Sequence, residues 1–322
     1  MQFPSHTPST DIDTLREALI MMVDDEPVIL QVIQAQLEDG GYKKFVVTSE
    51  ALQAIDLLEE KRPDVLLLDL MMPEMDGLQI LSRMHVENIL KDTPVIVLTS
   101  SKDPAAKLKA LELGATDFLA KPVDPSELLL RLGNTLSTKI YRDRLANYDS
   151  LTGTPNRNLF MDRLDRALGQ ADRYRHDGAV LHVGIDQFRK VNTDHGPRLG
   201  DVVLQRVAQR LENCLRTTDT VMRLADGPRP SLSRFAGDEF NFLLPLIRRR
   251  DDAVRFAERV LSAVATPFPV SDQQLTFTCS IGISLFPKDG RTADLLMRNA
   301  AIAMQQAKEA GKNTFRFYSG DS

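Results

Sequence analysis

The feature that most constrains the fold is a repeated alternation of short apolar runs and amphipathic stretches over the first 136 residues. Such runs occur at 18–23, 45–47, 65–70, 95–100 and 117–120. Short runs that are apolar throughout are typical of strands covered on both faces. Their alternation with amphipathic stretches predicts βαβ units, and therefore an α/β fold with a doubly wound, five-stranded parallel sheet.

Polar side chains stand at or next to the ends of four of these runs. Asp24 and Asp25 follow the first run, and Asp69 lies near the end of the third. The carboxyl ends of parallel strands meet at one edge of a sheet, so these carboxylates should lie close together. Anions at that spacing repel one another, and a divalent cation such as Mg²⁺ compensates them. Thr99 and Lys121 add a hydroxyl and an ammonium, so the set predicts a phosphoryl site where an aspartate attacks a phosphohistidine.

The order and spacing of four segments closely resemble those of the receiver domains of bacterial response regulators, over roughly 18–136. The segments are MMVDDEP, LLLDLMMPEMDG, VIVLTSS and FLAKPVD. This resemblance implies that Asp69 accepts a phosphoryl group from a sensor histidine kinase or a phosphotransfer protein. It also implies that Mg²⁺ is held by Asp24, Asp25, Asp69 and the backbone carbonyl of Met71.

The same resemblance assigns three further residues in the last two segments. Thr99 would be the switch hydroxyl and Lys121 the clamp on the phosphate. Phe118 falls at the position of an aromatic rotamer switch, with an ordinary core aromatic as the alternative. The Lys121-Pro122 bond resembles the family's cis peptide, an isomer that only proline makes accessible at low cost.

The length of 322 residues predicts two compact units, because about 150 residues is typical of one domain. We predict a disordered leader over 1–16, a receiver domain over 17–136, a helical linker over 137–150 and a second domain over 151–322. The linker is an exposed helix, and its spaced apolar residues leave a coiled-coil dimer seam open as an alternative.

In the second domain, longer helical stretches separate apolar runs at 179–185, 240–246 and 275–286, a pattern that predicts an α+β fold. An exposed, inserted loop is expected at 225–233. Five ordered motifs resemble the GGDEF domain of diguanylate cyclases, with its nucleotide-cyclase-like fold, over about 149–318: YDSLTGTPNRNLF, GIDQFRKVNTDHGPRLGD, FAGDEF, SIGISLFPKDG and AKEAGKN. That family condenses two GTP molecules into cyclic di-GMP, a phosphoryl transfer dominated by positioning and metal charge.

Residue by residue, the resemblance places guanine contacts at Asn192 and Asp201 and phosphate contacts at Lys308 and Lys312. The two lysines are four residues apart, so one helical face should present both ammonium groups. A glycine in the hairpin turn, Gly237, would let phosphates approach the backbone.

The FAGDEF turn also carries two acidic residues with implied roles. Asp238 would be a metal ligand, and Glu239 an acidic group near the reacting hydroxyl if the domain is a cyclase. Ala236 replaces the first glycine of the turn, which restricts positive φ.

A graver departure from the family is Gly184, where cyclases usually carry the other metal-binding aspartate. Asp186 shares the strand face by the two-residue period but lies about 7 Å along the strand, too far to replace that ligand readily. Weak or absent cyclase activity is therefore expected. The family's product-inhibition motif, RxxD, has only poorly spaced candidates at Arg216 to Asp219 and Arg223 to Asp226.

The favoured hypothesis is a phosphorelay response regulator whose GGDEF-like domain takes part in cyclic di-GMP signalling, binds GTP or cyclic di-GMP, and catalyses poorly. One alternative is an active diguanylate cyclase, and another is a protein-interaction module. The ending NTFRFYSGDS resembles the stretch that leads into EAL domains, so a regulatory part of a longer GGDEF-EAL protein also stays open.

Composition restricts the remaining partners. A net charge of -5 and the lack of a nucleic-acid-binding motif argue against nucleic acid. No apolar run approaches the roughly 18 residues that cross a bilayer, so no membrane association is expected. Two isolated cysteines, Cys214 and Cys279, suit a reducing, cytoplasmic compartment. A homodimer is expected on phosphorylation, through a shift of the receiver equilibrium.

Overall fold

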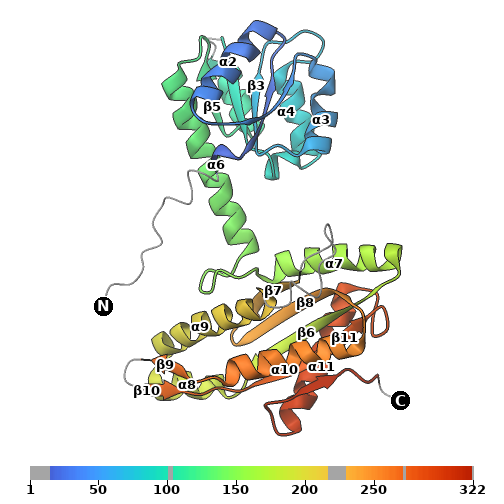
Figure 1. Cartoon of the computed structure of the whole chain (residues 1–322). Helices are drawn as coiled ribbons and strands as arrows, with labels where there is room; N and C mark the ends of the chain where they lie inside the picture. Colours follow the sequence, from blue (N-terminus) through green and yellow to red (C-terminus); the bar gives the residue numbers. More distant parts are fainter. Residues whose placement is uncertain (1–14, 101–103, 217–229, 271–272, 321–322) are drawn as a thin grey trace. The chain divides into compact units, whose positions relative to one another are not determined.

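The chain divides into two compact units, 1–143 and 144–322 (Figure 1). The computed structural model describes residues 15–100, 104–216, 230–270 and 273–320. Outside these ranges lie most of the predicted leader and the first part of the predicted 225–233 loop. The candidate RxxD motif at Arg216 to Asp219 lies partly outside them, and the one at Arg223 to Asp226 lies wholly outside. Leu15 and Arg16, assigned to the leader, belong to a helical turn.

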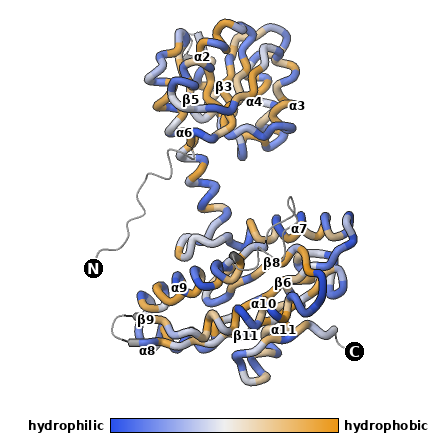
Figure 2. Tube along the Cα trace, in the orientation of Figure 1, coloured by the Kyte–Doolittle hydropathy of each residue, from blue (hydrophilic) through white to orange (hydrophobic). Residues whose placement is uncertain are grey.

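The first unit contains a five-stranded parallel sheet in the order β2-β1-β3-β4-β5, which confirms the predicted architecture. Its strands are β1 Leu19–Val23, β2 Lys44–Thr48, β3 Val65–Asp69, β4 Val95–Thr99 and β5 Asp117–Ala120. Each apolar run seen in the sequence coincides with one strand to within one or two residues. In Figure 2 the strands of this unit are coloured mainly as hydrophobic, which is expected for strands covered on both faces.

Helices cover both faces of this sheet (Figure 1). They are α2 Pro27–Asp39, α3 Ala54–Lys61, α4 Gly77–Val86, α5 Pro104–Glu112 and α6 Pro125–Asn147, with 3₁₀ turns η1 Ala51–Gln53 and η2 Ile89–Lys91. Side chains of β3 alternate between two cores: Leu66 and Leu68 pack with α3 and α4, whereas Val65 and Leu67 pack with α2 and α6.

Helix α6 is longer than the predicted linker. It starts at Pro125 as the last helix of the first unit, buries Leu128 and Leu132 there, and ends at Asn147. Asn156 then binds its last turn: the side chain donates to the carbonyl of Ala146 at 2.7 Å and the backbone N–H to that of Asn147 at 2.8 Å. Most of 137–150 is therefore a continuation of α6, and the boundary between the units falls within this helix.

The second unit contains a five-stranded sheet in the order β12-β11-β6-β8-β7, antiparallel except where β12 joins β11. Its strands are β6 Asp177–Ile185, β7 Ser231–Ala236, β8 Glu239–Ile247, β11 Cys279–Phe286 and β12 Phe315–Phe317, and a small hairpin is formed by β9 Phe268–Val270 and β10 Gln273–Leu275. Residues 231–233, predicted as loop, are strand, and the run predicted from 275 enters the central sheet only at Cys279.

Two layers of helices enclose the second sheet. They are α7 Arg157–Tyr174, α8 Phe188–His195, α9 Pro197–Arg216, α10 Arg250–Ala265 and α11 Ala293–Glu309. Helices α9 and α10 share one core with the odd-numbered residues of β6, and α7 and α11 share another with Val180. Gly282 on β11 permits α11 to lie very close, because a Cβ there would be 1.9 Å from the carbonyl oxygen of Ala300.

None of the helices in the described ranges is both long enough and apolar enough to span a membrane.

Candidate functional site

Three carboxylates meet at the carboxyl edge of the first sheet. Strands β1 and β3 are neighbours with Val23 opposite Leu68, so Asp24 and Asp69 continue two adjacent strands. Ligand oxygens of Asp24, Asp25 and Asp69 all lie within 4.8 Å of one another. Asp24 is wholly buried and Asp69 is 3% exposed, so these charges are largely removed from water.

The ammonium of Lys121 lies between two of these carboxylates. Its Nζ is 2.7 Å from Asp24 Oδ2 and 3.0 Å from Asp69 Oδ1. Burial works to lower the pKa of Lys121, but its hydrogen bonds to Asp24 and Asp69 outweigh burial and the pKa is raised. Burial likewise raises the pKa of Asp69, although the hydrogen bond from Lys121 opposes this. The peptide bond between Lys121 and Pro122 is cis, as the resemblance implied.

Thr99, Phe118 and Met71 lie around this edge in different environments. Thr99 is buried at the end of β4, one residue beyond Leu98, which is the register partner of Asp69. Phe118 is partly buried against a receiver core, with the ammonium of Lys107 4.8 Å from its ring centroid. The side chain of Met71 is exposed, and only its backbone could serve the predicted role two residues after Asp69.

The acidic edge fits a divalent cation. Asp24, Asp25 and Asp69 offer three carboxylates, and carboxylate oxygens are the ligands that Mg²⁺ prefers. The ammonium of Lys121 pairs with two of the three carboxylates, so these four side chains together still carry net negative charge. Mg²⁺ at this position would neutralise charge on an incoming phosphoryl group.

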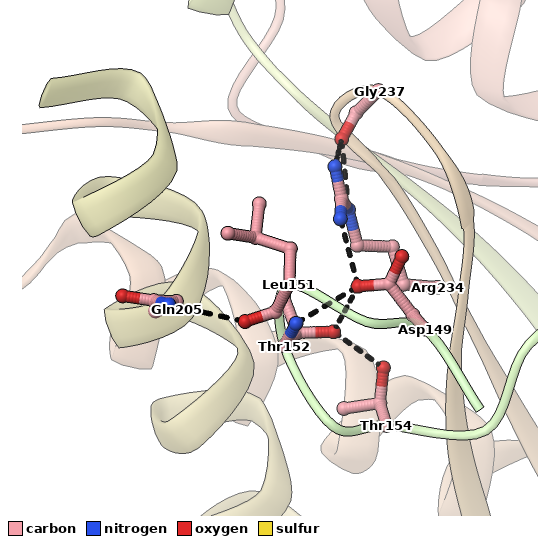
Figure 3. Close-up of polar contacts among 7 residues, drawn as sticks. All are labelled: Asp149, Leu151, Thr152, Thr154, Gln205, Arg234 and Gly237. Carbon is pink, nitrogen blue, oxygen red and sulfur yellow. Dashed lines mark hydrogen bonds and ion pairs between the residues drawn. The ribbon is translucent and has the colours of Figure 1, made fainter. Parts of the chain in front are cut away.

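In the second unit, an arginine that sequence reasoning missed holds the hairpin between β7 and β8 (Figure 3). Arg234 donates from Nε and Nη2 to the carbonyl of Gly237, at 3.0 and 2.8 Å, and from Nη1 to Asp149 at 2.7 Å. Asp149 also accepts from the backbone N–H and the hydroxyl of Thr152. Gly237 has a φ of +54°, which favours glycine, whereas Ala236 lies in strand β7 without positive φ.

Both acidic residues of the hairpin are about half-buried. Burial raises the pKa of Asp238. Glu239 faces a histidine that sequence reasoning missed: His182 Nε2 is 3.5 Å from Glu239 Oε2, and this contact lowers the pKa of Glu239. The other nitrogen of His182, Nδ1, is 2.5 Å from Asn241 Oδ1. A polar residue inside the apolar run at 179–185 was the available signal for His182.

The space above Gly184 is filled from helix α11. A Cβ built on Gly184 would lie 2.8 Å from the sulfur of Met304 and 3.0 Å from Nζ of Lys308. Lys308 therefore stands over the strand position where the resemblance to cyclases implies a carboxylate, and Gly184 pairs with Glu239 in the antiparallel register of β6 and β8.

Asp186 is committed to other partners and does not replace that carboxylate. It is buried, and it accepts hydrogen bonds from the hydroxyls of Thr278 at 2.7 Å and Ser280 at 2.8 Å, and from the backbone N–H of Asn313 at 3.1 Å. This network joins β6 to β11 and to the segment after α11, so Asp186 has a structural role.

The predicted guanine contacts lie on two consecutive helices. Asn192 belongs to α8, and its Oδ1 would be 2.0 Å from a Cβ on Gly200 in α9. The amide of Asn192 therefore lies against the first turn of α9, and Asp201, the residue after Gly200 in the chain, is exposed.

The two predicted phosphate contacts do not share a helical face. Helix α11 ends at Glu309, so Lys308 belongs to its last turn while Lys312 lies beyond it. Gly311, with a φ of +113°, and Lys312, with a φ of +65°, turn the chain away. Lys308 is partly buried and Lys312 is exposed, so the expectation based on four-residue helical spacing is wrong.

Two family models match the chain. The model described as "Diguanylate cyclase, GGDEF domain" matches residues 146–314, which is more than half of the chain. The model described as "Response regulator receiver domain" matches residues 20–133.

Individual relatives agree with these matches. The chain is 30% identical to the response regulator PleD of Caulobacter vibrioides over 91% of its own length and 64% of that protein. It is 39% identical to MucR of Pseudomonas aeruginosa, a bifunctional diguanylate cyclase and cyclic di-GMP phosphodiesterase, over 54% of its length and 24% of that protein. The chain thus spans less than two thirds of either relative.

A solved structure shares the fold of the second unit. The coiled coil and GGDEF domain of DgcB from Caulobacter crescentus, solved in complex with c-di-GMP, covers 60% of this chain and 96% of its own, with a TM-score of 0.52 and 20% identity.

Proposed function

We propose that this chain, which belongs to the GGDEF family and carries a receiver domain ahead of its GGDEF domain, is a phosphorylation-controlled regulator of cyclic di-GMP signalling with impaired cyclase activity. The observation that carries the second half of the proposal is the filled space above Gly184. The first half rests on the acidic edge of the receiver sheet.

Phosphorylation would take place on Asp69. A carboxylate oxygen forms a bond to the phosphorus of a phosphohistidine donor while the phosphorus–nitrogen bond breaks, and the donor imidazole takes up a proton. The product is an acyl phosphate, whose new charge adds to the anions already present. Lys121, which already contacts Asp69, would stay beside the phosphoryl oxygens, and Thr99 would contribute its hydroxyl. Mg²⁺, when bound by the acidic edge, supplies further positive charge.

The GGDEF domain would bind GTP or cyclic di-GMP yet turn GTP over poorly. Asn192 and Asp201 would contact a guanine base, which is supported by the packing of Asn192 against Gly200, and the ammonium of Lys308 is directed to the face that carries Glu239. A glycine at 184 removes one metal-binding carboxylate from the reacting centre. Loss of one such ligand is expected to cost about 4 kcal/mol of transition-state stabilisation, which is about a thousandfold in rate.

Phosphorylation would act on the GGDEF domain by promoting a homodimer. Two large apolar side chains on α6, Tyr141 and Leu145, are four residues apart and are 66% and 57% exposed. Residues at this spacing lie on one helical face and would suit a helix of a second copy. Beryllium fluoride, which imitates the acyl phosphate, should therefore raise the dimer fraction in analytical sedimentation, and an unchanged monomer would count against this part of the proposal.

The test of the main proposal is incubation of purified protein with GTP and Mg²⁺, with and without beryllium fluoride. Cyclic di-GMP is followed by chromatography, and GTP binding by calorimetry. Bound GTP with little or no product supports a receiver-controlled nucleotide sensor. Rapid formation of cyclic di-GMP would overturn the impaired-cyclase proposal.

A second candidate function, a working cyclase, is favoured by the hairpin. Gly237 retains its positive φ, and Ala236 lies in extended strand, so the loss of the first glycine causes no backbone strain. Glu239 also lies at the register position opposite Gly184. The same incubation distinguishes this function, because it predicts product that increases with beryllium fluoride.

A further inference from the structure

We propose that the GGDEF site of this chain uses the ammonium of Lys308, beside the imidazole of His182, in place of a protein-bound divalent cation, so that it binds GTP without requiring Mg²⁺. This inference rests on the proposed nucleotide binding. It specifies that the bound ligand is GTP without Mg²⁺. It concerns only the second unit, because the receiver's acidic edge fits Mg²⁺ well.

The carboxylates of the hairpin do not form a group that fits a cation. Among the described residues, one group of three acidic, histidine or cysteine side chains has mutually close ligand atoms, and that group is the receiver trio. Within the described ranges, Asp238 and Glu239 have no third carboxylate grouped with them, because position 184 is glycine and Asp186 is bound by Thr278, Ser280 and Asn313. A metal ion therefore could not be held here by one carboxylate from β6 at position 184 and one from the hairpin at β8.

Helix α11 supplies a cation at that place. Met304 and Lys308 are four residues apart, and the ends of both side chains lie 2.8 to 3.1 Å from where a Cβ of residue 184 would be. The close approach of α11 at Gly282 brings this face of the helix onto the sheet. A side chain at position 184 would therefore require the flexible ends of Met304 and Lys308 to shift.

The charge of Lys308 acts on both hairpin carboxylates, Asp238 and Glu239. His182 adds a second contact, with Nε2 3.5 Å from Glu239 Oε2. His182 and Gly184 are two residues apart and lie on the same face of β6. A hydrogen bond between Nδ1 of His182 and Oδ1 of Asn241 orients the imidazole. The two carboxylates are therefore accompanied by the ammonium of Lys308 and by the imidazole of His182, at the place where a divalent cation would otherwise lie.

This arrangement predicts how the site meets a nucleotide. The ammonium of Lys308 can bind a phosphate oxygen directly with a charge-assisted hydrogen bond. A magnesium ion carried by GTP would meet this ammonium, and no carboxylate at 184 would receive it. Binding energy should therefore come from the base and from Lys308, and removal of Mg²⁺ should leave it nearly unchanged.

The experiment is calorimetric titration of the full chain with GTP in excess EDTA and in excess Mg²⁺. Equal dissociation constants, within about twofold, are expected. Lys308→Met should weaken binding about tenfold or more in both buffers, which corresponds to the loss of one charge-assisted contact. Lys288→Met removes an exposed lysine of the same unit and should change neither value.

Gly184→Asp provides the converse variant. The atoms that a new side chain would meet are the flexible ends of Met304 and Lys308, so they can move aside. This variant should bind GTP more tightly with Mg²⁺ than with EDTA, and circular dichroism should show an unchanged fold. Wild-type binding that needs Mg²⁺ would overturn the inference while leaving nucleotide binding intact. No binding in either buffer would overturn the proposed nucleotide function and the inference with it.

Discussion

Arg234 and Asp149 form an ion pair at 2.7 Å that ties the start of the second unit to its hairpin. The same guanidinium donates to the carbonyl of Gly237, so one side chain contacts both the segment after α6 and the turn that precedes Asp238 (Figure 3). The side chains are 9% and 21% exposed, which shields the pair from water. The position of the hairpin therefore depends on the residues that immediately follow the helix.

Replacing Arg234 should destabilise the second unit. Arg234→Met leaves Asp149 without its cation and the carbonyl of Gly237 without its donors, and breaking a largely buried pair from one side costs about 3 kcal/mol. The measurement is the denaturant dependence of unfolding. Arg166→Met, which breaks an exposed pair with Asp162 on α7, should change the unfolding free energy by less than about 1 kcal/mol. Equal effects of the two variants would contradict the prediction.

The same ion pair predicts a pH dependence. Burial would raise the pKa of Asp149, but hydrogen bonds from Thr152 and Arg234 outweigh it, and the pKa lies below the usual 3.8. A lowered pKa contributes stability above the unfolded value, and this contribution is lost as the pH falls from 3.8 through the folded pKa. The unfolding free energies of the wild type and Asp149→Asn should therefore converge below pH 3.8. A constant difference across that range would show that the charge of Asp149 is not responsible.

Sequence patterns predicted the strands of the receiver because a buried parallel strand is apolar throughout, a property visible in the chain itself. They also brought Asp24, Asp69 and Lys121 to one edge, since strand ends in a parallel sheet coincide. Arg234 and His182 were missed, because Asp149, the ionic partner of Arg234, lies in a segment far away in the sequence, and the partners of His182 are set by the register between β6 and β8. The prediction that Lys308 and Lys312 share a helical face is wrong for a local reason: α11 ends at Glu309, so Lys312 lies beyond the helix.

Phosphorylation should require Asp69. Acetyl phosphate and Mg²⁺ should add one phosphoryl group to the wild type, detected by intact-protein mass spectrometry, and Asp69→Asn should abolish this addition because the amide is not a nucleophile. Asp56→Asn, at an exposed position on α3, is the matched control and should be phosphorylated normally. A phosphoryl group on the Asp69→Asn protein would place the acceptor elsewhere.

Removing the ammonium of Lys121 should make the receiver depend on a metal for stability. Lys121→Met leaves the buried Asp24 and Asp69 without a cation, at an expected cost of about 3 to 5 kcal/mol in EDTA. Mg²⁺ should restore more stability to this variant than to the wild type, because it binds the same carboxylates. The control is Lys109→Met, which breaks an exposed pair with Glu112. A variant insensitive to Mg²⁺ would argue against a cation at this edge.

The closeness of α11 to the second sheet can be tested at Gly282. A Cβ at this position would lie 1.9 Å from the carbonyl oxygen of Ala300 and 2.2 Å from the backbone nitrogen of Met304, so Gly282→Ala must push the helix away. Overpacking of this kind costs about 1 to 3 kcal/mol.

The matched control for this substitution is Gly169→Ala. Gly169 lies within α7 with nothing within 4 Å of its would-be Cβ, and the change should stabilise by about 0.5 to 1 kcal/mol because alanine favours helix. Since α11 carries Lys308, Gly282→Ala should also weaken GTP binding, whereas Gly169→Ala should not. If Gly282→Ala loses stability but binds GTP normally, the packing of α11 does not position Lys308, and the lysine reaches the nucleotide by its own flexibility.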